Sequence, residues 1–200
     1  MKITTPMDQD AKEDVFFGQV VTIGARWFLI VAGMIMLMWT AVEERQAGIL
    51  LLGVAPLIAL TGLNFFLHGS YLLGRPLNSN FILLTSLLDL AVITLLVLFW
   101  PGQRGLDNQF FIFYYPAVLA FAFSMPRKIE VAFTVVAIVA YSAAVLPYFD
   151  YSSIIEVQHG FKSLLIRLIA LGAVGGLGNY YFRIYRSRRQ AAMPATSLPR

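Results

Sequence analysis

The chain has 200 residues, of which 58% are hydrophobic and only 13% charged, whereas soluble domains carry about a quarter charged residues. So much apolar surface cannot be buried in a water-soluble core of this length, which excludes an ordinary soluble domain. The absence of cysteine excludes disulfides, thiolate metal sites and cysteine nucleophiles. The 15 basic and 11 acidic residues are scattered over short segments, which indicates membrane topology and no nucleic-acid binding.

Six apolar stretches follow one another along the chain, and each approaches the roughly 20 residues that a helix needs to cross a bilayer. Residues 1–25 are polar and acidic, lack a secretory signal and are expected to form a cytoplasmic tail. A transmembrane domain is predicted over 26–183, and a basic, disordered cytoplasmic tail over 184–200. The predicted spans are 27–42 (or from 20), 47–67, 81–100, 110–125, 129–147 and 163–182, with a longer loop at 148–162.

The predicted fold class is an all-α polytopic integral membrane protein with six transmembrane helices. The runs are long and apolar on every side, whereas the strands of a membrane barrel need only about ten residues with strict alternation. No internal repeat is recognisable in the sequence, so the inverted repeats of many transporters are missing. Small-solute transport is the least favoured function, because few polar residues lie in the runs.

Lysine and arginine predict the orientation, because they concentrate in cytoplasmic loops. With six spans and a cytoplasmic N-terminus, eleven basic residues fall on the cytoplasmic side and four on the other side. Both termini are therefore expected in the cytoplasm. The eleven are Lys2, Lys12, Arg26, Arg75, Arg127, Lys128, Arg183, Arg186, Arg188, Arg189 and Arg200, and the four are Arg45, Arg104, Lys162 and Arg167.

Asp89 is the one acidic residue well inside a predicted span. An unpaired carboxylate there is costly, so it has to be protonated, hydrogen-bonded or directed to a polar interior. The functional interpretation is a proton or ligand site. The structural one, which we favour, is a helix-packing carboxylic acid bonded to Ser86, Thr85 or Asn64, and it predicts that asparagine but not leucine can replace Asp89. Arg167, near the outer end of the sixth span, can reach water and is not expected to pair with Asp89.

Two amides and two glycines are expected to pack helices together. Asn64 and Asn179 lie near the cytoplasmic ends of the second and sixth spans, where each can hydrogen-bond to a neighbouring helix. Gly172 and Gly176 form a small-xxx-small pair that permits close approach of a helix of this chain or of another, and leucine there should weaken the packing of the sixth span. The cytoplasmic end of that span is expected to be anchored by charge through Arg183, Arg186, Arg188 and Arg189.

Aromatic residues crowd the start of the fourth span, and they favour an interfacial belt over a pocket for an apolar ligand or pigment. These residues are Phe110, Phe111, Phe113, Tyr114 and Tyr115.

The sequence contains no phosphate-binding loop in a strand–helix context and neither the Gly-x-Ser-x-Gly nor the His-Glu-x-x-His motif. No catalytic residue, metal site or cofactor is therefore predicted, with a bound lipid or pigment left open, and the chain is expected not to be an enzyme.

The segment 102–118, GQRGLDNQFFIFYYPAV, resembles a pattern in the multi-span N-terminal membrane regions of bacterial sensor histidine kinases. There a glycine-rich outer turn and a polar residue precede aromatic residues and a proline-bearing helix. The segments 86–90, which contains Asp89, and 181–186, YFRIYR, are similar to the same family, and the resemblance covers roughly Arg26 to Arg189. It implies a sensor-like fold in a bacterial cytoplasmic (inner) membrane. The phosphoaccepting helix and ATP-binding domain of such kinases have no counterpart before Arg200, so no signalling output is implied.

Two functions of different classes remain. In the first, which the sequence favours, the chain is a non-catalytic accessory or structural subunit that packs against other membrane subunits in a larger energy-transducing or photosynthetic complex. In the second, it is a free-standing sensory or regulatory module that binds an apolar ligand or reports on the bilayer. Such a module would pass a helix movement through 183–189 to a partner.

Overall fold

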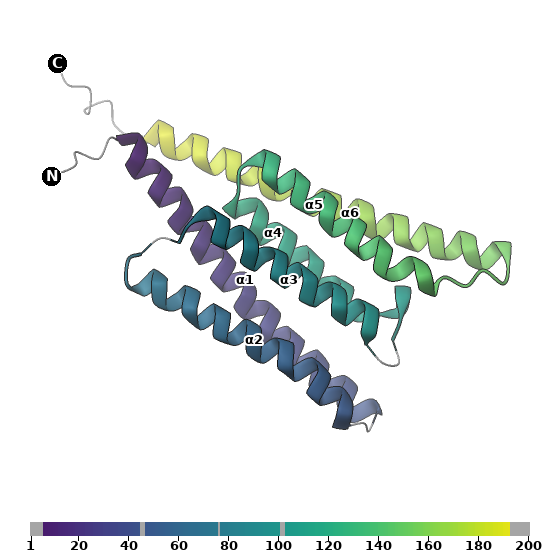
Figure 1. Cartoon of the computed structure of the whole chain (residues 1–200). Coiled ribbons are helices and arrows are strands. Elements are labelled where there is room, and N and C mark those ends of the chain that lie inside the picture. Colours follow the sequence, from purple (N-terminus) through teal and green to yellow (C-terminus); the bar gives the residue numbers. More distant parts are fainter. Residues whose placement is uncertain (1–5, 45–46, 76, 101–102, 193–200) are drawn as a thin grey trace, which may run out of the picture.

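The computed structural model describes residues 6–44, 47–75, 77–100 and 103–192, and every element in these ranges is a helix. Figure 1 shows the helices packed lengthwise into one bundle. The α-helices are α1 (Pro6–Glu44), α2 (Ala47–Leu72), α3 (Ser79–Phe99), α4 (Tyr114–Ser124), α5 (Arg127–Val145) and α6 (Ile154–Ala192). Short 3-10 turns cover Gly105–Asp107, Gln109–Phe113 and Leu146–Tyr148.

Within the described residues, five helices are long and apolar enough to cross a membrane, so the predicted all-α, membrane-spanning character is confirmed. A sixth apolar helix, Gln109–Ser124, is shorter. The five candidate spans are Phe16–Thr40, Gly53–Leu72, Ser79–Phe99, Arg127–Tyr148 and Ile154–Tyr185.

The short helix α4 lies in the middle of the bundle, where it contacts α1, α3, α5 and α6. It is preceded by a 3-10 turn, Gln109–Phe113, which rises more per residue than an α-helix. Together the 3-10 turn and α4 are about 26 Å long at the usual rises of roughly 2.0 and 1.5 Å per residue. Because protein surrounds it, α4 does not need the length of a helix that faces lipid, and Tyr114, Val118 and Phe121 on it are almost fully buried.

Asn108 sets the position of this central helix. Its Oδ1 accepts the backbone N–H of Phe110 at 2.8 Å, which caps the 3-10 turn. Its Nδ2 donates to the carbonyl oxygens of Leu96, Val97 and Gln103 at 3.2, 3.2 and 2.9 Å. Two of these carbonyls lie in the last turn of α3, where the helix supplies few backbone donors; the Leu96 carbonyl also accepts the N–H of the C-cap residue Trp100 at 3.2 Å. A single amide therefore closes the end of one helix and starts the next.

The helix α6 begins earlier than expected. Residues 154–162 were predicted to belong to a loop, but they form its first turns. The reason is a local one: Ser153 and Glu156 have the spacing of a capping box, and the Ser153 hydroxyl accepts the backbone N–H of Glu156 at 3.2 Å. At the other end α6 continues through 184–192, the first part of the predicted tail, and 193–200 lie outside the described residues.

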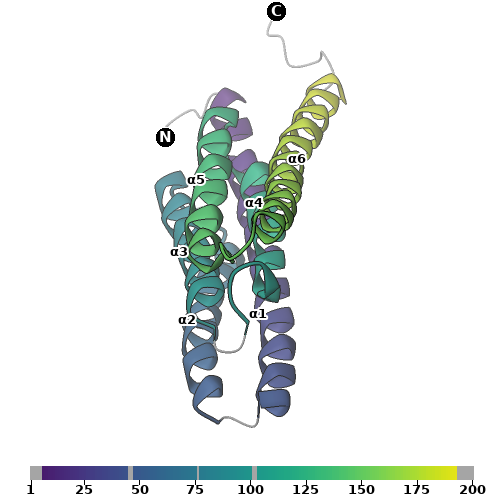
Figure 2. The ribbon, with the colours of Figure 1, turned by 90° about the vertical axis from the view of Figure 1, so that its right-hand side faces the viewer.

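The two ends of the described chain lie at the same end of the bundle (Figure 1). The rings of Phe17 on α1 and Tyr185 on α6 stack there, with centroids 5.0 Å apart. Figure 2 shows α6 along one edge of the bundle. Only 17% of the most apolar 18-residue stretch of α6 is buried, against 28% to 39% for the corresponding stretches of the other four candidate spans. The helix α6 is thus the span with the largest share of surface left free.

Candidate functional site

A buried ion pair joins α1 to α3. Arg26 Nε donates to Asp89 Oδ1 at 2.9 Å, and Arg26 Nη2 donates to Asp89 Oδ2 at 2.5 Å. The two side chains are 1% and 8% exposed. The geometry is that of a bidentate arginine–carboxylate pair, in which two parallel charge-assisted bonds fix both position and orientation.

The predicted partners of Asp89 were wrong. Its carboxylate pairs with Arg26, while the Thr85 hydroxyl donates to its own helix at Ile82 and Asn64 donates to the carbonyl of Ile23. Arg26 was predicted to be a cytoplasmic residue because the uncharged run starts after it. The helix α1 is continuous from Pro6, so Arg26 lies inside the bundle and not at its edge.

Two buried amide side chains join α1 to α2. Asn64 is fully buried, and its Nδ2 donates to the carbonyl oxygen of Ile23 at 3.3 Å. Gln19 is also fully buried; it donates to the carbonyl of Leu67 at 3.0 Å and accepts the N–H of Leu77 at 3.4 Å. These amides bond to backbone atoms of neighbouring segments, which is the helix-packing geometry.

Glu130 is a second buried carboxylate, and the sequence interpretation did not single it out. It is 2% exposed. Its Oε1 accepts from the Thr134 hydroxyl, and its Oε2 accepts from Asn179 Nδ2, both at 3.1 Å. This contact joins α5 to α6 and gives Asn179 its partner. The predicted fifth span, 129–147, includes Glu130 at its start, directly after Pro126-Arg127-Lys128, but no role was assigned to it. The available signal was a threonine four residues later, on the same helix face.

Glycines shape α6, but they are not the predicted ones. A Cβ atom added at Gly172 or Gly176 would meet nothing within 4 Å, so the predicted pair packs against no described part of this chain. At Gly175 a Cβ would lie 2.7 Å from Thr134 Oγ1 and 3.0 Å from Glu130 Oε1. At Gly178 it would lie 2.8 Å from Ala122 Cβ. Gly175 and Gly178 therefore let α6 approach α5 and α4.

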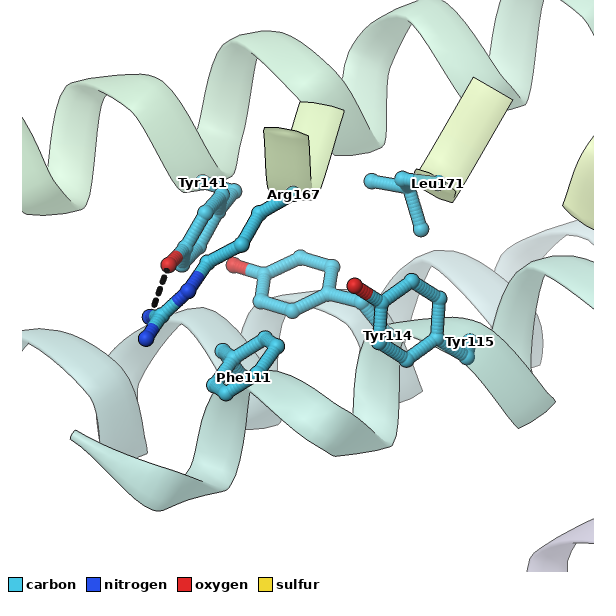
Figure 3. A pocket seen from close by; sticks show the side chains of 6 residues that line it. All are labelled: Phe111, Tyr114, Tyr115, Tyr141, Arg167 and Leu171. Carbon is cyan, nitrogen blue, oxygen red and sulfur yellow. Dashed lines mark hydrogen bonds between the residues drawn. The ribbon is translucent and has the colours of Figure 1, made fainter. Parts of the chain in front are cut away.

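Arg167 lies in a cluster of aromatic rings that also lines a small cavity (Figure 3). Its Nη1 donates to the Tyr141 hydroxyl at 2.8 Å, and its guanidinium carbon lies 3.9 Å from the centroid of the Phe111 ring. Tyr114 shares a hydrogen bond of 2.8 Å with Thr94. As expected from the sequence, Arg167 does not pair with Asp89, and the aromatic rings hold its charge.

A small cavity of about 10 Å³ lies within this aromatic cluster. Such a volume holds about one water molecule and no pigment. It is lined by Phe111, Tyr114, Tyr115, Tyr141, Arg167 and Leu171. Among the residues that the structure describes, no group of three histidines or acidic residues could hold a metal ion.

The arginines at the end of α6 are described in part. The side chains of Arg183 and Arg188 are exposed, while those of Arg186 and Arg189 lie outside the described side chains.

Comparison with known proteins found no matching family model, no matching curated protein and no matching solved structure. The fold and the buried contacts define a helical membrane protein whose spans are joined by polar side chains.

Proposed function

We propose that the chain is a non-catalytic sensory or regulatory membrane module in which α6 carries a movement to its cytoplasmic end. One observation carries the proposal: α6 is a single 39-residue helix that is joined to the rest of the bundle by polar side chains at two levels. Arg167 bonds to Tyr141 at the first level and Asn179 to Glu130 at the second. The two levels are about 18 Å apart along the helix at roughly 1.5 Å per residue.

A helix held in this way is suited to relay a displacement. Small shifts and rotations of packed helices are a common form of conformational change in proteins. A change in the aromatic cluster around Arg167 would shift α6 along or about its axis, and the other polar contact would have to adjust. The exposed Arg183 and Arg188 would then move relative to α1, on which Tyr185 stacks at Phe17.

The topology that we propose has six crossings, counting the short α4, with both termini in the cytoplasm of a bacterial cell. Support comes from the two ends of the described chain lying together (Figure 1). It also comes from the basic residues: without the buried Arg26, ten of the predicted eleven remain on the cytoplasmic side against four on the other side.

Cysteine labelling in whole cells tests this topology, because the natural chain has no cysteine to remove. Ser152→Cys, in the exposed loop before α6, is expected to react with a membrane-impermeant maleimide in intact cells. Ser187→Cys, exposed near the end of α6, should react only after the cells are opened. The reverse pattern, or labelling of both sites in intact cells, would contradict the proposed orientation.

The relay itself is tested by a distance measurement between spin labels at Asn80→Cys and Ser187→Cys, both exposed at the proposed cytoplasmic end. Arg167→Gln removes the charge that holds α6 to the aromatic cluster, so we expect a shifted or broadened distance distribution in lipid nanodiscs. Lys162→Gln, an exposed change on the same helix, serves as control and should leave the distribution as it is. An unchanged distribution for Arg167→Gln would refute the relay.

A second function, the accessory subunit of a larger membrane complex, is favoured by the free face of α6. Gly172 and Gly176 leave the backbone open with nothing of the described chain within 4 Å. Small residues of this kind allow another membrane helix to approach closely. Their replacement separates this function from the first, as argued in the Discussion.

A further inference from the structure

We infer that the cluster around Arg167 binds the head group of a single-chain amphiphile that carries a carboxylate, such as a long-chain fatty acid. Such a ligand would be the signal of the proposed sensory function, and its biological role rests on that proposal. The binding itself does not depend on any relay and is measured separately.

The first argument is an unbalanced charge. The ion pair of the described residues is Arg26–Asp89, and Arg167 has no acidic partner among them. The one hydrogen bond of Arg167 to a described residue uses Nη1, so donors remain on Nε and Nη2. A guanidinium presents these donors as a planar fork that matches the two oxygens of a carboxylate.

The second argument is the depth of Arg167 in the bundle. Its partner Tyr141 lies seven residues before Tyr148, which is about 12 Å at rises of roughly 1.5 Å per residue in α5 and roughly 2.0 Å in the 3-10 turn that follows it. Tyr148 belongs to the end of the bundle, where it meets Arg104 and Gly105. The guanidinium therefore lies below the loops, near the level where lipid head groups meet acyl chains. The Arg167 side chain is partly exposed, so the head group of an adjacent lipid can reach it, and an anionic head group would pair its charge.

The third argument is the shape and chemistry of the walls. The rings of Phe111 and Tyr115 contact each other edge to face at 6.0 Å, and both are partly exposed. Phe111 lies against the guanidinium (Figure 3). The two rings offer apolar surface to the first carbons of a chain, and the Tyr141 hydroxyl keeps the guanidinium in place. The cavity of about 10 Å³ admits about one water molecule, so a head group would bind at the partly exposed edge of the cluster, with little space around it. A compact carboxylate on one chain fits these limits better than the phosphate of a two-chain phospholipid.

The test uses the whole protein in nanodiscs of phosphatidylcholine and spin-labelled probes of the same chain length. The probes are doxyl-stearate, its methyl ester and doxyl-labelled phosphatidylglycerol, and electron paramagnetic resonance gives the motionally restricted fraction of each. We expect selective retention of the stearate at a pH where it is ionised. Arg167→Gln should lower its relative association constant roughly tenfold, the usual scale for one charge-assisted contact.

Two further variants keep the result interpretable. Arg167→Lys keeps the charge without the planar fork and should lose part of the selectivity. Lys162→Gln should lose none, because Lys162 is exposed on the same helix outside the cluster. Circular dichroism and size-exclusion elution confirm that each variant is folded. Equal retention of the methyl ester, equal or stronger retention of phosphatidylglycerol, or unchanged stearate binding in the folded Arg167→Gln variant would each overturn the inference.

Discussion

Asp89→Leu is expected to remove most of the folded protein from the membrane, because it leaves the buried guanidinium of Arg26 without its counter-charge. Breaking a buried ion pair by removing one partner costs about 3–5 kcal/mol. That is a large fraction of the roughly 5–15 kcal/mol that stabilises an ordinary folded domain. Asp89→Asn is expected to be destabilising as well, since an amide cannot balance the charge. The sequence alone had predicted that asparagine would be tolerated.

The double variant Arg26→Leu/Asp89→Leu distinguishes two causes of instability: the loss of the ion pair itself, and a buried charge left without its partner. Replacing both partners by apolar residues of similar volume is often neutral or stabilising, so the double variant should recover much of the abundance that either single variant loses. Asp107→Asn, an exposed position in the loop after α3, is the matched control. The measurements are abundance in the membrane fraction and thermal unfolding in detergent. A double variant no more abundant than Asp89→Leu would show that the pair is needed for more than neutrality.

Gly178→Leu is expected to destabilise the bundle, whereas Gly176→Leu two residues earlier should leave its stability unchanged. At Gly178 even a Cβ atom would lie 2.8 Å from Ala122 Cβ and 3.1 Å from Leu119 Cδ1, so α6 would have to move away from α4. Overpacking of this kind costs about 1–3 kcal/mol. At Gly176 a Cβ would meet nothing within 4 Å. Thermal unfolding of the two variants in the same detergent gives the comparison.

The same pair of variants tests the accessory-subunit function. If another membrane protein packs on the free face of α6, Gly176→Leu should reduce co-purification with it in mild detergent while the melting temperature stays at the wild-type value. Gly172→Leu should behave in the same way. If both variants unfold like Gly178→Leu, the described packing of α6 is wrong. If wild type is monomeric in nanodiscs and retains no partner from its own membranes, the subunit function fails and the sensory one remains.

Local sequence pattern was enough to predict the class of the fold and the approximate position of its helices. Long apolar runs between polar turns predict membrane helices because an unpaired backbone cannot be placed in lipid, and α3, expected at 81–100, is found at Ser79–Phe99. The Ser153–Glu156 capping box was also present in the sequence, although the interpretation placed a loop there. Such features depend on neighbours along the chain, and they can be read from local pattern.

Which polar residues contact each other depends on how the helices pack, and the sequence pattern did not predict it. Arg26 and Asp89 are separated by 63 positions, and Glu130 and Asn179 by 49. Hydrophobic periodicity says that such residues lie on helices, but it does not say which helices are neighbours or how they are rotated. The same reason explains the glycines. Gly172, Gly175, Gly176 and Gly178 are alike in sequence, and only the rotation of α6 against α4 and α5 makes two of them close contacts and leaves the other two open.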